Sequence, residues 1–407
     1  MKKASKSLVT LLTLITLLQL AACSHNNRLK KSREPEVTNK AKCIEISMQE
    51  TKIELERKPT PAKEDSFATI LSFGDALCHI PVFNAAYNSE IDDYDFSYMF
   101  QYVTKYFQNS TINIGNCETP MAGKERGYSG FPSFNTPEHL AIDLAELGVD
   151  IMTTANNHTL DQGFNGLTST LQFLDKAGIA HVGSARTAEE QSAILFRNLN
   201  GINTAFLSYT YGTNGIPAPE GKEFCVNLIN EEFMLHQIEQ AKARGAELIV
   251  ASMHWGNEYE TTPNEKQYQL AKFLIEHGVQ LILGSHPHVL QPMERIKTES
   301  GKEGFVIFSQ GNFFSNQRQE NTRNTAIFNI EVKKSGETEK VSIEGVTYVP
   351  IYVSIKEPGA EHRYELWDLN EIIRSYEAGE ETWTEEAYQL AVKERERCIK
   401  LIEPENE

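Results

Sequence analysis

Residues 279–288 read Val-Gln-Leu-Ile-Leu-Gly-Ser-His-Pro-His, a short apolar run that ends in two histidines separated by one proline. The run predicts a buried strand over residues 279–283, with His286 and His288 just beyond its carboxyl end. In an extended segment, residues i and i+2 point to the same side, and the proline stiffens the pair. Both imidazoles can then reach one metal ion or two adjacent ions.

The same arrangement, an apolar strand followed by polar side chains, recurs at four other places in the chain. These clusters are Gly74-Asp75, Asn116-Cys117-Glu118, Asn156-Asn157-His158 and His254-Trp255-Gly256. In open α/β sheets, ligands bind beyond the carboxyl ends of the strands. Five strand ends that bring carboxylate, amide and imidazole groups to one edge therefore predict a metal site. Mixed imidazole and carboxylate donors suit one or two divalent ions of Zn, Mn or Fe.

Each cluster taken alone also has a structural interpretation. Asp75 or Glu118 could cap a helix or pair with a cation, the adjacent asparagines could be turn residues, and His254 could be packed in the core. The clusters taken together favour a metal centre, because four of the 11 histidines fall in three of them. A two-metal hydrolytic site needs a bridging carboxylate or amide, outer imidazoles and a proton donor, and these residues offer all three.

Strand and helix patterns alternate on both sides of these clusters. The order predicts an α/β or layered αββα domain with its chemistry at the strand ends. A C-terminal helical extension is expected over residues 354–407, with two charged amphipathic helices in residues 364–402. We expect strands over residues 67–73, 111–114, 150–154, 202–208, 248–253, 305–308, 325–332 and 341–349, and helices over residues 136–147, 164–177, 231–244 and 264–277.

The first 23 residues have the layout of an export signal. A basic start is followed by an apolar run over residues 8–22, shorter than the roughly 20 residues that a membrane-spanning helix needs. Leu-Ala-Ala directly before Cys23 resembles the bacterial lipobox, so we expect a lipoprotein signal peptide over residues 1–23 and lipidation of Cys23. The alternative is a plain signal peptide with a chance cysteine. Residues 24–66, rich in Lys, Glu, Asn and Pro, are expected to be a flexible linker, and the protein to be anchored on the extracytoplasmic side of the cell membrane.

Charge and motif content exclude several functions. The 407 residues include 39 Lys and Arg against 56 Asp and Glu, a net charge of −17. Such a chain is a poor nucleic-acid binder, and it attracts no polyanion unless a local cation, such as a bound metal, supplies the attraction. The sequence contains no GxSxG elbow, no GxxxxGK[ST] loop and no GxGxxG fingerprint, which disfavours triad hydrolysis and ATP-driven ligation.

In this order, the clusters resemble the CapA family of capsule-biosynthesis proteins, which supports poly-γ-glutamate production in bacteria. The family is similar to calcineurin-like metallophosphoesterases, so the resemblance implies a four-layer αββα sandwich around a dimetal site, in a domain over residues 67–353. It rests on Gly74-Asp75, Asn116-Cys117-Glu118-Thr119-Pro120, Asn156-Asn157-His158 with Asp161 and Gly163, His254-Trp255-Gly256-Asn257-Glu258-Tyr259, Gly284-Ser285-His286-Pro287-His288-Val289 and Ser309-Gln310-Gly311-Asn312-Phe313.

The resemblance also implies roles for individual residues. His158 would protonate a leaving group or orient an oxyanion of the substrate, and Asn312 would turn the last strand toward the site or serve only as a turn residue. Asn157 would bridge two ions or ligate one through its amide oxygen. The implied metal ligands are Asp75, Glu118, Asn157, His254, His286 and His288. Substrate contacts are expected from Trp255, Glu258 and Asn156, although Trp255 and Glu258 could simply pack.

One departure from the phosphoesterase pattern bears on the number of metal ions. That pattern begins with Asp-x-His, whereas Leu77 stands at the histidine position and His79 lies two residues further on. A single ion, or an asymmetric pair, is therefore an alternative to two fully ligated ions.

Three functions remain open on the sequence. The first is a lipid-anchored accessory of poly-γ-glutamate capsule synthesis or export with a metal-dependent, hydrolase-like site. Its partners would be the membrane, through the lipid, and the capsule polymer or its synthesis machinery. The second is a metallophosphoesterase acting on a cell-envelope phosphoester. The third is a non-catalytic metal-binding scaffold.

Overall fold

The computed structural model describes residues 63–404. The signal peptide expected over residues 1–23, its Cys23 and most of the linker expected over residues 24–66 lie outside the described residues. The chain divides into two units, and Thr60–Glu407 is the unit that holds every described residue. Within residues 63–404, no helix is both long enough and apolar enough to cross a membrane.

The first sheet is built around β1 (Ser66–Ala76), which runs parallel to β4 (Ile112–Cys117) and antiparallel to β14 (Asn324–Lys334). Its strand order is β16-β15-β14-β1-β4-β5-β6, and β13 pairs with the end of β1. The other strands of this sheet are β5 (Ile151–Thr153), β6 (Ala180–Val182), β13 (Asn312–Phe314), β15 (Val341–Ile355) and β16 (Tyr364–Asp368).

The second sheet has the order β11-β12-β10-β9-β8-β7. Its inner strands are parallel, and β7 and β11 close the two edges in antiparallel pairing. Parallel inner strands end at the same edge of the sheet, so the residues that follow them meet there. The strands are β7 (Leu195–Leu199), β8 (Ile202–Thr210), β9 (Leu248–His254), β10 (Leu281–Ser285), β11 (Leu290–Lys297) and β12 (Glu303–Gln310).

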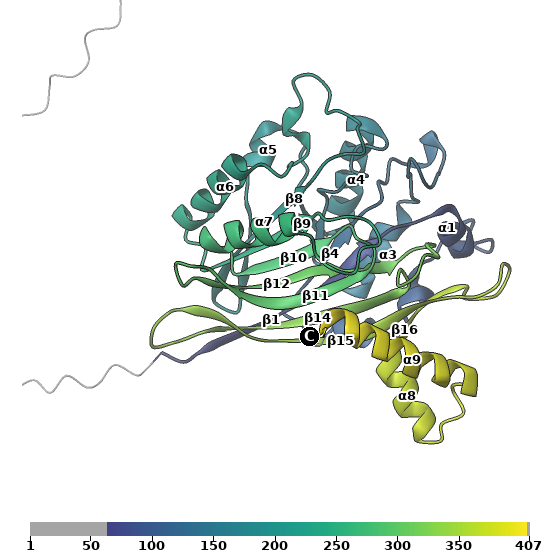
Figure 1. Ribbon diagram of the computed structural model, residues 1–407. Coiled ribbons are helices and arrows are strands. Elements are labelled where there is room, and N and C mark those ends of the chain that lie inside the picture. The colour runs from purple at the N-terminus through teal and green to yellow at the C-terminus, as the bar shows by residue number, and fades with distance from the viewer. Residues whose placement is uncertain (1–62, 405–407) are drawn as a thin grey trace, which may run out of the picture. The chain divides into compact units, whose positions relative to one another are not determined.

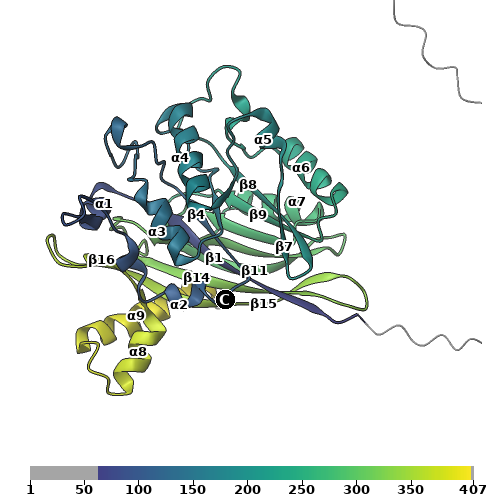
Figure 2. The ribbon, with the colours of Figure 1, turned by 180° about the vertical axis from the view of Figure 1, so that it is seen from behind.

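Helices cover the outer faces of both sheets, as the opposite views in Figures 1 and 2 show. α3 (His139–Leu147) and α4 (Gly163–Ala177) pack on the first sheet, and α6 (Glu231–Ala243) and α7 (Glu265–Glu276) pack on the second. The expected four-layer αββα sandwich is therefore confirmed. The smaller elements are α1 (Ile80–Ala86), β2 (Tyr87–Asn88), β3 (Asp93–Tyr94), η1 (Ser97–Phe100), α2 (Thr104–Phe107), η2 (Lys124–Arg126), α5 (Ala188–Ser192) and η3 (Glu223–Cys225).

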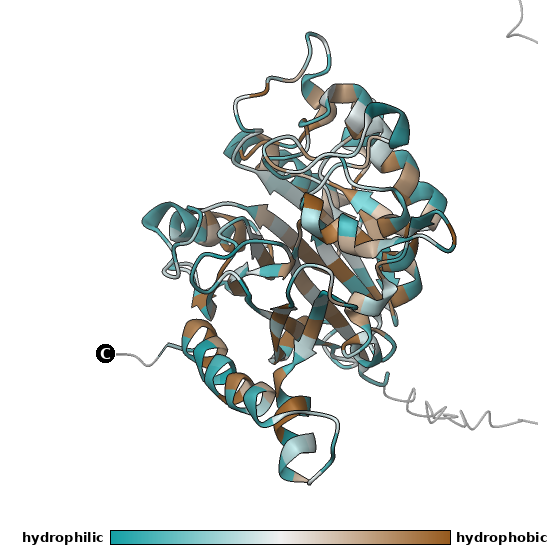
Figure 3. Cartoon of the chain, turned by 90° about the vertical axis from the view of Figure 1, so that its right-hand side faces the viewer, coloured by the Kyte–Doolittle hydropathy of each residue, from teal (hydrophilic) through white to brown (hydrophobic). Residues whose placement is uncertain are grey.

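The core between the sheets consists of side chains from alternate strand positions. Ile70 of β1, Phe206 of β8 and Val250 of β9 are buried in it. Because successive strand residues point to opposite faces, Leu71 and Phe73 instead face the outer cluster under α3 and α4. Each sheet is thus apolar on both faces, and Figure 3 shows hydrophobic residues concentrated along the strands.

Local contacts define the ends of three helices. α7 begins with a capping box, because Asn264 accepts from the backbone of Gln267 and the Gln267 side chain accepts from the backbone of Asn264. α4 ends at Gly178, whose φ of 82° is left-handed. α3, however, begins at His139 without a side-chain cap, because the hydroxyl of Thr136 bonds to Thr119 instead.

The C-terminal segment joins the same core. Residues 364–368, expected to be helical, form the edge strand β16, and α8 (Leu369–Glu377) and α9 (Glu385–Ile402) follow. α9 lies against β11, β14 and β15. Ile372 of α8 and Cys398 of α9 are fully buried in the inter-sheet cluster. The two helices therefore cover the part of the first sheet that extends past β11.

Candidate metal centre

The carboxyl ends of four strands bring the predicted ligands together at one edge of the two sheets. Asp75 lies at the end of β1 and Glu118 directly follows β4, and the pairing of Asp75 with Asn116 places them side by side. His254 ends β9, beside Ser285 of the neighbouring strand β10. The first sheet thus supplies carboxylates and the second supplies imidazoles.

One group of potential metal ligands consists of Asp75, Glu118 and His288, all buried. Each offers one ligand atom, and these atoms lie within 4.8 Å of one another. Asp75 Oδ2 is 3.2 Å from His288 Nδ1, and Glu118 Oε1 is 3.7 Å from His288 Nε2. We call this group the first triad.

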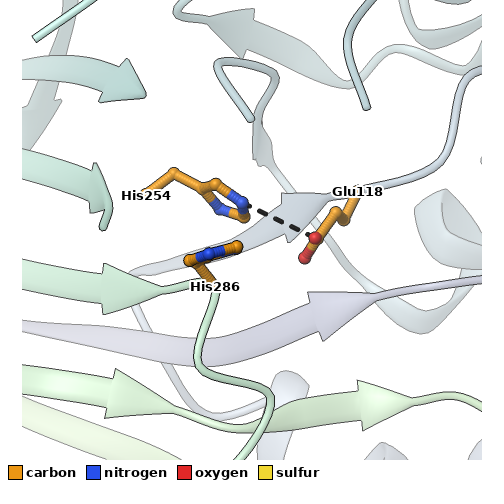
Figure 4. Close-up of side chains that lie close together, drawn as sticks. All are labelled: Glu118, His254 and His286. Carbon is orange, nitrogen blue, oxygen red and sulfur yellow. Dashed lines mark ion pairs between the residues drawn. The ribbon is translucent and has the colours of Figure 1, made fainter. Parts of the chain in front are cut away.

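A second triad consists of Glu118, His254 and His286, shown in Figure 4. His254 Nε2 lies 3.5 Å from Glu118 Oε1 and 2.8 Å from Asn157 Oδ1. Glu118 belongs to both triads, so it is the carboxylate that would be shared if an ion bound in each. Asn157 Oδ1 lies beside His254 on the side of the second triad.

The residues at this edge fit a divalent cation. Glu118 Oε1 and His286 Nδ1 are buried and have no hydrogen-bond partner among the described residues. A buried polar atom without a partner costs about 1–3 kcal/mol, and a cation next to both would remove that cost. The mixture of nitrogen and oxygen donors is one that transition-metal ions and zinc accept.

Burial sets the protonation of these groups. It raises the pKa of Glu118 well above its usual value, with a further contribution from the negative charge of Asp75. Burial lowers the pKa of His254 well below its usual value and lowers the pKa of His286 to about 3. Neutral imidazole is the form that binds a metal, and two close buried carboxylates call for a positive charge between them.

Neighbouring polar residues hold the ligands in position. Asn116 Nδ2 donates to Asp75 Oδ1 at 2.8 Å and to Glu118 Oε2 at 3.3 Å. The hydroxyl of Ser285 lies 2.8 Å from His254 Nδ1. Such outer contacts fix the orientation of metal ligands. Asn116 was noticed in the sequence only as part of a cluster, and its role as a clamp on two carboxylates was missed.

The His-Pro-His segment is not extended, contrary to expectation. His286 and His288 both have positive φ, 98° and 59°, in a bend that follows β10. Positive φ is uncommon for residues other than glycine and marks a constrained backbone. Of the two buried triads, His288 belongs to the first and His286 to the second, and a third group combines both histidines with Glu258.

His158 lies beside the centre at a cleft of about 650 Å³. Its Nδ1 is 2.8 Å from Asp161 Oδ2, and its ring packs edge-on against Phe134. The same cleft is lined by His288 and by His79, which is not part of either triad. His158 and a metal ligand therefore border one cavity, as a proton donor to a bound substrate requires.

The three expected substrate contacts have different surroundings. Trp255 is 2% exposed, and its indole nitrogen donates to the backbone oxygen of Phe308. Asn156 is also buried; its amide donates to Cys117 O and accepts from the backbone of His158. Glu258 is exposed and lies beside His286 and His288. Substrate binding by these residues stays a prediction, with Asn156 placed to position His158.

Two residues near the centre were missed. Tyr211 packs against His286 with ring centroids 4.6 Å apart, and Asn214 Oδ1 accepts from Asn157 Nδ2 at 3.2 Å. Both lie in the loop after β8, at the same sheet edge as the other clusters. The strand-end rule, applied to β8, would have indicated them.

Two mixed sheets between helical layers, with imidazoles and carboxylates clustered at the strand ends, define a four-layer αββα domain with a candidate metal centre. The chain belongs to the family of bacterial capsule synthesis proteins described as PGA_cap, whose model matches residues 69–317. The resemblance to the CapA family is thereby confirmed.

Individual relatives and solved structures are similar to this chain over most of the domain. The capsule biosynthesis protein CapA of Bacillus anthracis is 27% identical over 288 residues, which cover 68% of this chain and 67% of the relative. The PGA biosynthesis protein CapA of Bacillus subtilis is 30% identical over 265 residues, covering 62% and 67%. Among solved structures, the calcineurin-like phosphoesterase YfkN of Bacillus subtilis has a TM-score of 0.44 at 14% identity, covering 83% of this chain and 98% of that one.

Proposed function

We propose that this protein is a surface-anchored accessory of poly-γ-glutamate capsule synthesis or export, with a metal-dependent site that hydrolyses a bond in the polymer or in a molecule attached to it. Membership of the capsule synthesis family and the relatives from two Bacillus species support the biological role. The N-terminal layout around Cys23 supports the membrane anchor.

The observation that carries the proposed chemistry is the sharing of Glu118 by two triads of buried ligands. A divalent cation bound there would polarise the oxygen of a scissile phosphoryl or acyl group. Glu118 and Asp75 would hold the cation from one sheet, and the imidazoles would hold it from the other. His158, kept in place by Asp161, would deliver a proton to the leaving group from the adjoining cleft.

Two clefts meet at the centre and support an elongated, anionic substrate. The first, of about 650 Å³, is lined by His158, His288 and Arg318. The second, of about 440 Å³, is lined by His286 and Lys266. Arg318 and Lys266 are exposed and form no ion pair with any residue in 63–404. In an acidic protein, these two side chains are placed to bind carboxylates on either side of the reacting bond.

A second candidate is a metallophosphoesterase that acts on a cell-envelope phosphoester. This candidate is favoured by a carboxylate shared between two ligand groups with His158 close by. Phosphodiester cleavage at a metal centre uses a bridging group and a proton donor. A binding scaffold without turnover is the third candidate, supported only by the ligand set itself.

One experiment separates the three. The full chain is purified in detergent, its metal content is measured by mass spectrometry, and it is assayed on poly-γ-glutamate and on a model phosphodiester, beside Asp75→Asn and His286→Asn. Metal-dependent shortening of the polymer, lost in both variants, is the expected result. Turnover of the phosphodiester alone would favour the second candidate, and bound metal without turnover the scaffold. A chain that takes up no metal under any loading condition would overturn the assignment of the site.

A further inference from the structure

We propose that Glu258 is a metal ligand, which with His286 and His288 forms an outer metal position on the solvent side of the buried centre. The inference rests on the proposed metal centre and extends it. It gives Glu258 a role different from the substrate contact that the sequence indicates.

The three side chains already have the geometry of a metal site. One ligand atom from each of Glu258, His286 and His288 lies within 4.8 Å of the other two. The histidines are buried, whereas Glu258 is exposed. We call this group the outer triad. It is open to solvent on the carboxylate side and closed on the imidazole side.

The backbone fixes Glu258 next to the two histidines. The amide of Tyr259, the next residue, donates to the carbonyl oxygen of Pro287 at 2.8 Å, and Pro287 separates the histidines. The loop approaches them through Gly256, whose φ is 84° and where a Cβ would lie 2.9 Å from Gln267 Oε1. A residue with a side chain is therefore disfavoured at this point. The fold therefore holds the backbone at Glu258 next to the two histidines.

A ring nitrogen without a partner on the buried side is available to bind a metal ion. His286 is 4% exposed, and its Nδ1 has no hydrogen-bond partner among the described residues. His286 is also a member of the second triad, with Glu118 and His254. His286 has two ring nitrogens and can serve a buried metal position and the outer one. His288, whose Nδ1 lies beside Asn312 Oδ1, has one free nitrogen and serves either the first triad or the outer triad.

The surroundings of Glu258 leave its charge available for a cation. Glu258 forms no ion pair with a lysine, arginine or histidine within residues 63–404. It lines both clefts that meet at the centre, together with His286 in one and His288 in the other. A cation that approaches the buried ligands from either cleft passes this carboxylate. We therefore expect Glu258 to strengthen metal binding and to slow metal release.

The chain offers a matched control for the test. Glu260 is an exposed carboxylate on the same loop, two residues away, and it belongs to none of the three triads. Glu258→Gln and Glu260→Gln remove the same charge from the same loop. In Glu258→His, a nitrogen ligand replaces the carboxylate without restoring the charge.

The experiment measures Zn²⁺ and Mn²⁺ stoichiometry, affinity and release to a chelator in the full chain. Glu258→Gln is expected to lose one equivalent of metal, or to bind metal at least about tenfold more weakly and release it faster. Glu260→Gln should bind metal like the wild type. Glu258→His should recover Zn²⁺ affinity. Thermal unfolding of the metal-free variants checks that the fold is intact. If Glu258→Gln binds and releases metal like Glu260→Gln, the outer position is wrong while the buried centre stands. If the wild-type chain binds no metal, both proposals fail.

Discussion

Asn312 Oδ1 lies 3.0 Å from His288 Nδ1. The amide of Asn312 is itself held, because its nitrogen donates to the backbone oxygens of His288 and Thr322. A fixed acceptor beside Nδ1 favours the proton on that nitrogen, which leaves the Nε2 lone pair free. Nε2 is the nitrogen 3.7 Å from Glu118 Oε1.

Replacing Asn312 should therefore weaken metal binding without removing a ligand. In Asn312→Ala the ring of His288 loses its acceptor and can rotate or change tautomer, and we expect metal affinity to fall roughly 10- to 100-fold. Titration of the full chain with Zn²⁺ or Mn²⁺ measures this. Asn312→Asp, which keeps the acceptor, should retain most of the affinity. Equal affinity in wild type and Asn312→Ala would show that the contact does not orient the ligand.

Asp161 should act through His158. Its Oδ2 accepts from His158 Nδ1 and from the backbone of Phe134, both at 2.8 Å. Asp161→Asn should lower kcat by about 10²-fold or more for esters with poor leaving groups, because these need a proton from the acid. Esters with good leaving groups should lose much less, with metal content unchanged. A uniform loss across leaving groups would indicate a structural role only.

The two basic side chains at the clefts should control binding of an anionic polymer. Arg318→Ala and Lys266→Ala are each expected to raise the KM or Kd for a polyglutamate chain several-fold, with kcat changed little, because carboxylate pairing is lost away from the reacting bond. Both effects should shrink as salt is added. Lys272→Ala, an exposed lysine of the same helix as Lys266 that lines neither cleft, is the control. If none of the three variants changed the KM or Kd, Arg318 and Lys266 would be excluded as binding residues for the polymer.

Asp143, which is remote from the metal centre, should make the free energy of unfolding depend on pH. Burial raises its pKa to about 6, although Oδ2 accepts from the backbone of Phe96. The pKa of Asp143 is higher in the folded protein than in the unfolded chain. Its contribution to the free energy of unfolding is therefore complete below a pH of about 4 and is lost as the pH rises through about 6. Asp143→Asn keeps an oxygen that can accept from the backbone of Phe96 but has no group to ionise. It should therefore raise the free energy of unfolding at pH 7.5 by about 1–2 kcal/mol, allowing for solvent screening. Urea unfolding of both proteins at pH 4.5 and pH 7.5 measures the difference, and parallel pH profiles would contradict it.

The strand-end rule found the ligands because parallel strands align their carboxyl ends. Asp75, Glu118 and His254 each end or follow an apolar strand, and hydrogen-bonded pairing brings those ends together. The direction in which a side chain points was harder to predict. Trp255 adjoins a ligand in sequence but packs beneath α7 in the core, because neighbouring residues of an extended chain point to opposite sides. Proximity in sequence to a ligand therefore does not fix the direction of a side chain, and substrate binding by Trp255 stays a prediction.

Edge strands were the elements that sequence patterns missed. β11 contains Gln291, Pro292 and Glu294, and β16 is short and carries charges. Proline and charge are tolerated at a sheet edge, where one side of the strand forms no ladder, so no apolar run marks such strands. The left-handed histidines of the His-Pro-His bend were also missed, since the extended geometry assumed from spacing applies only inside a strand.

The position of β1 at the middle of the first sheet affects how the protein folds. Its residues pair on one side with β4 and on the other with β14, where Ser66 lies opposite Lys334. The central strand is thus among the first parts of the domain to be synthesised, yet one of its partners follows more than two hundred residues later. Contacts of such long sequence separation slow folding and leave strand edges exposed in the meantime. A chain with this topology needs its edges protected from aggregation until the C-terminal third has been made.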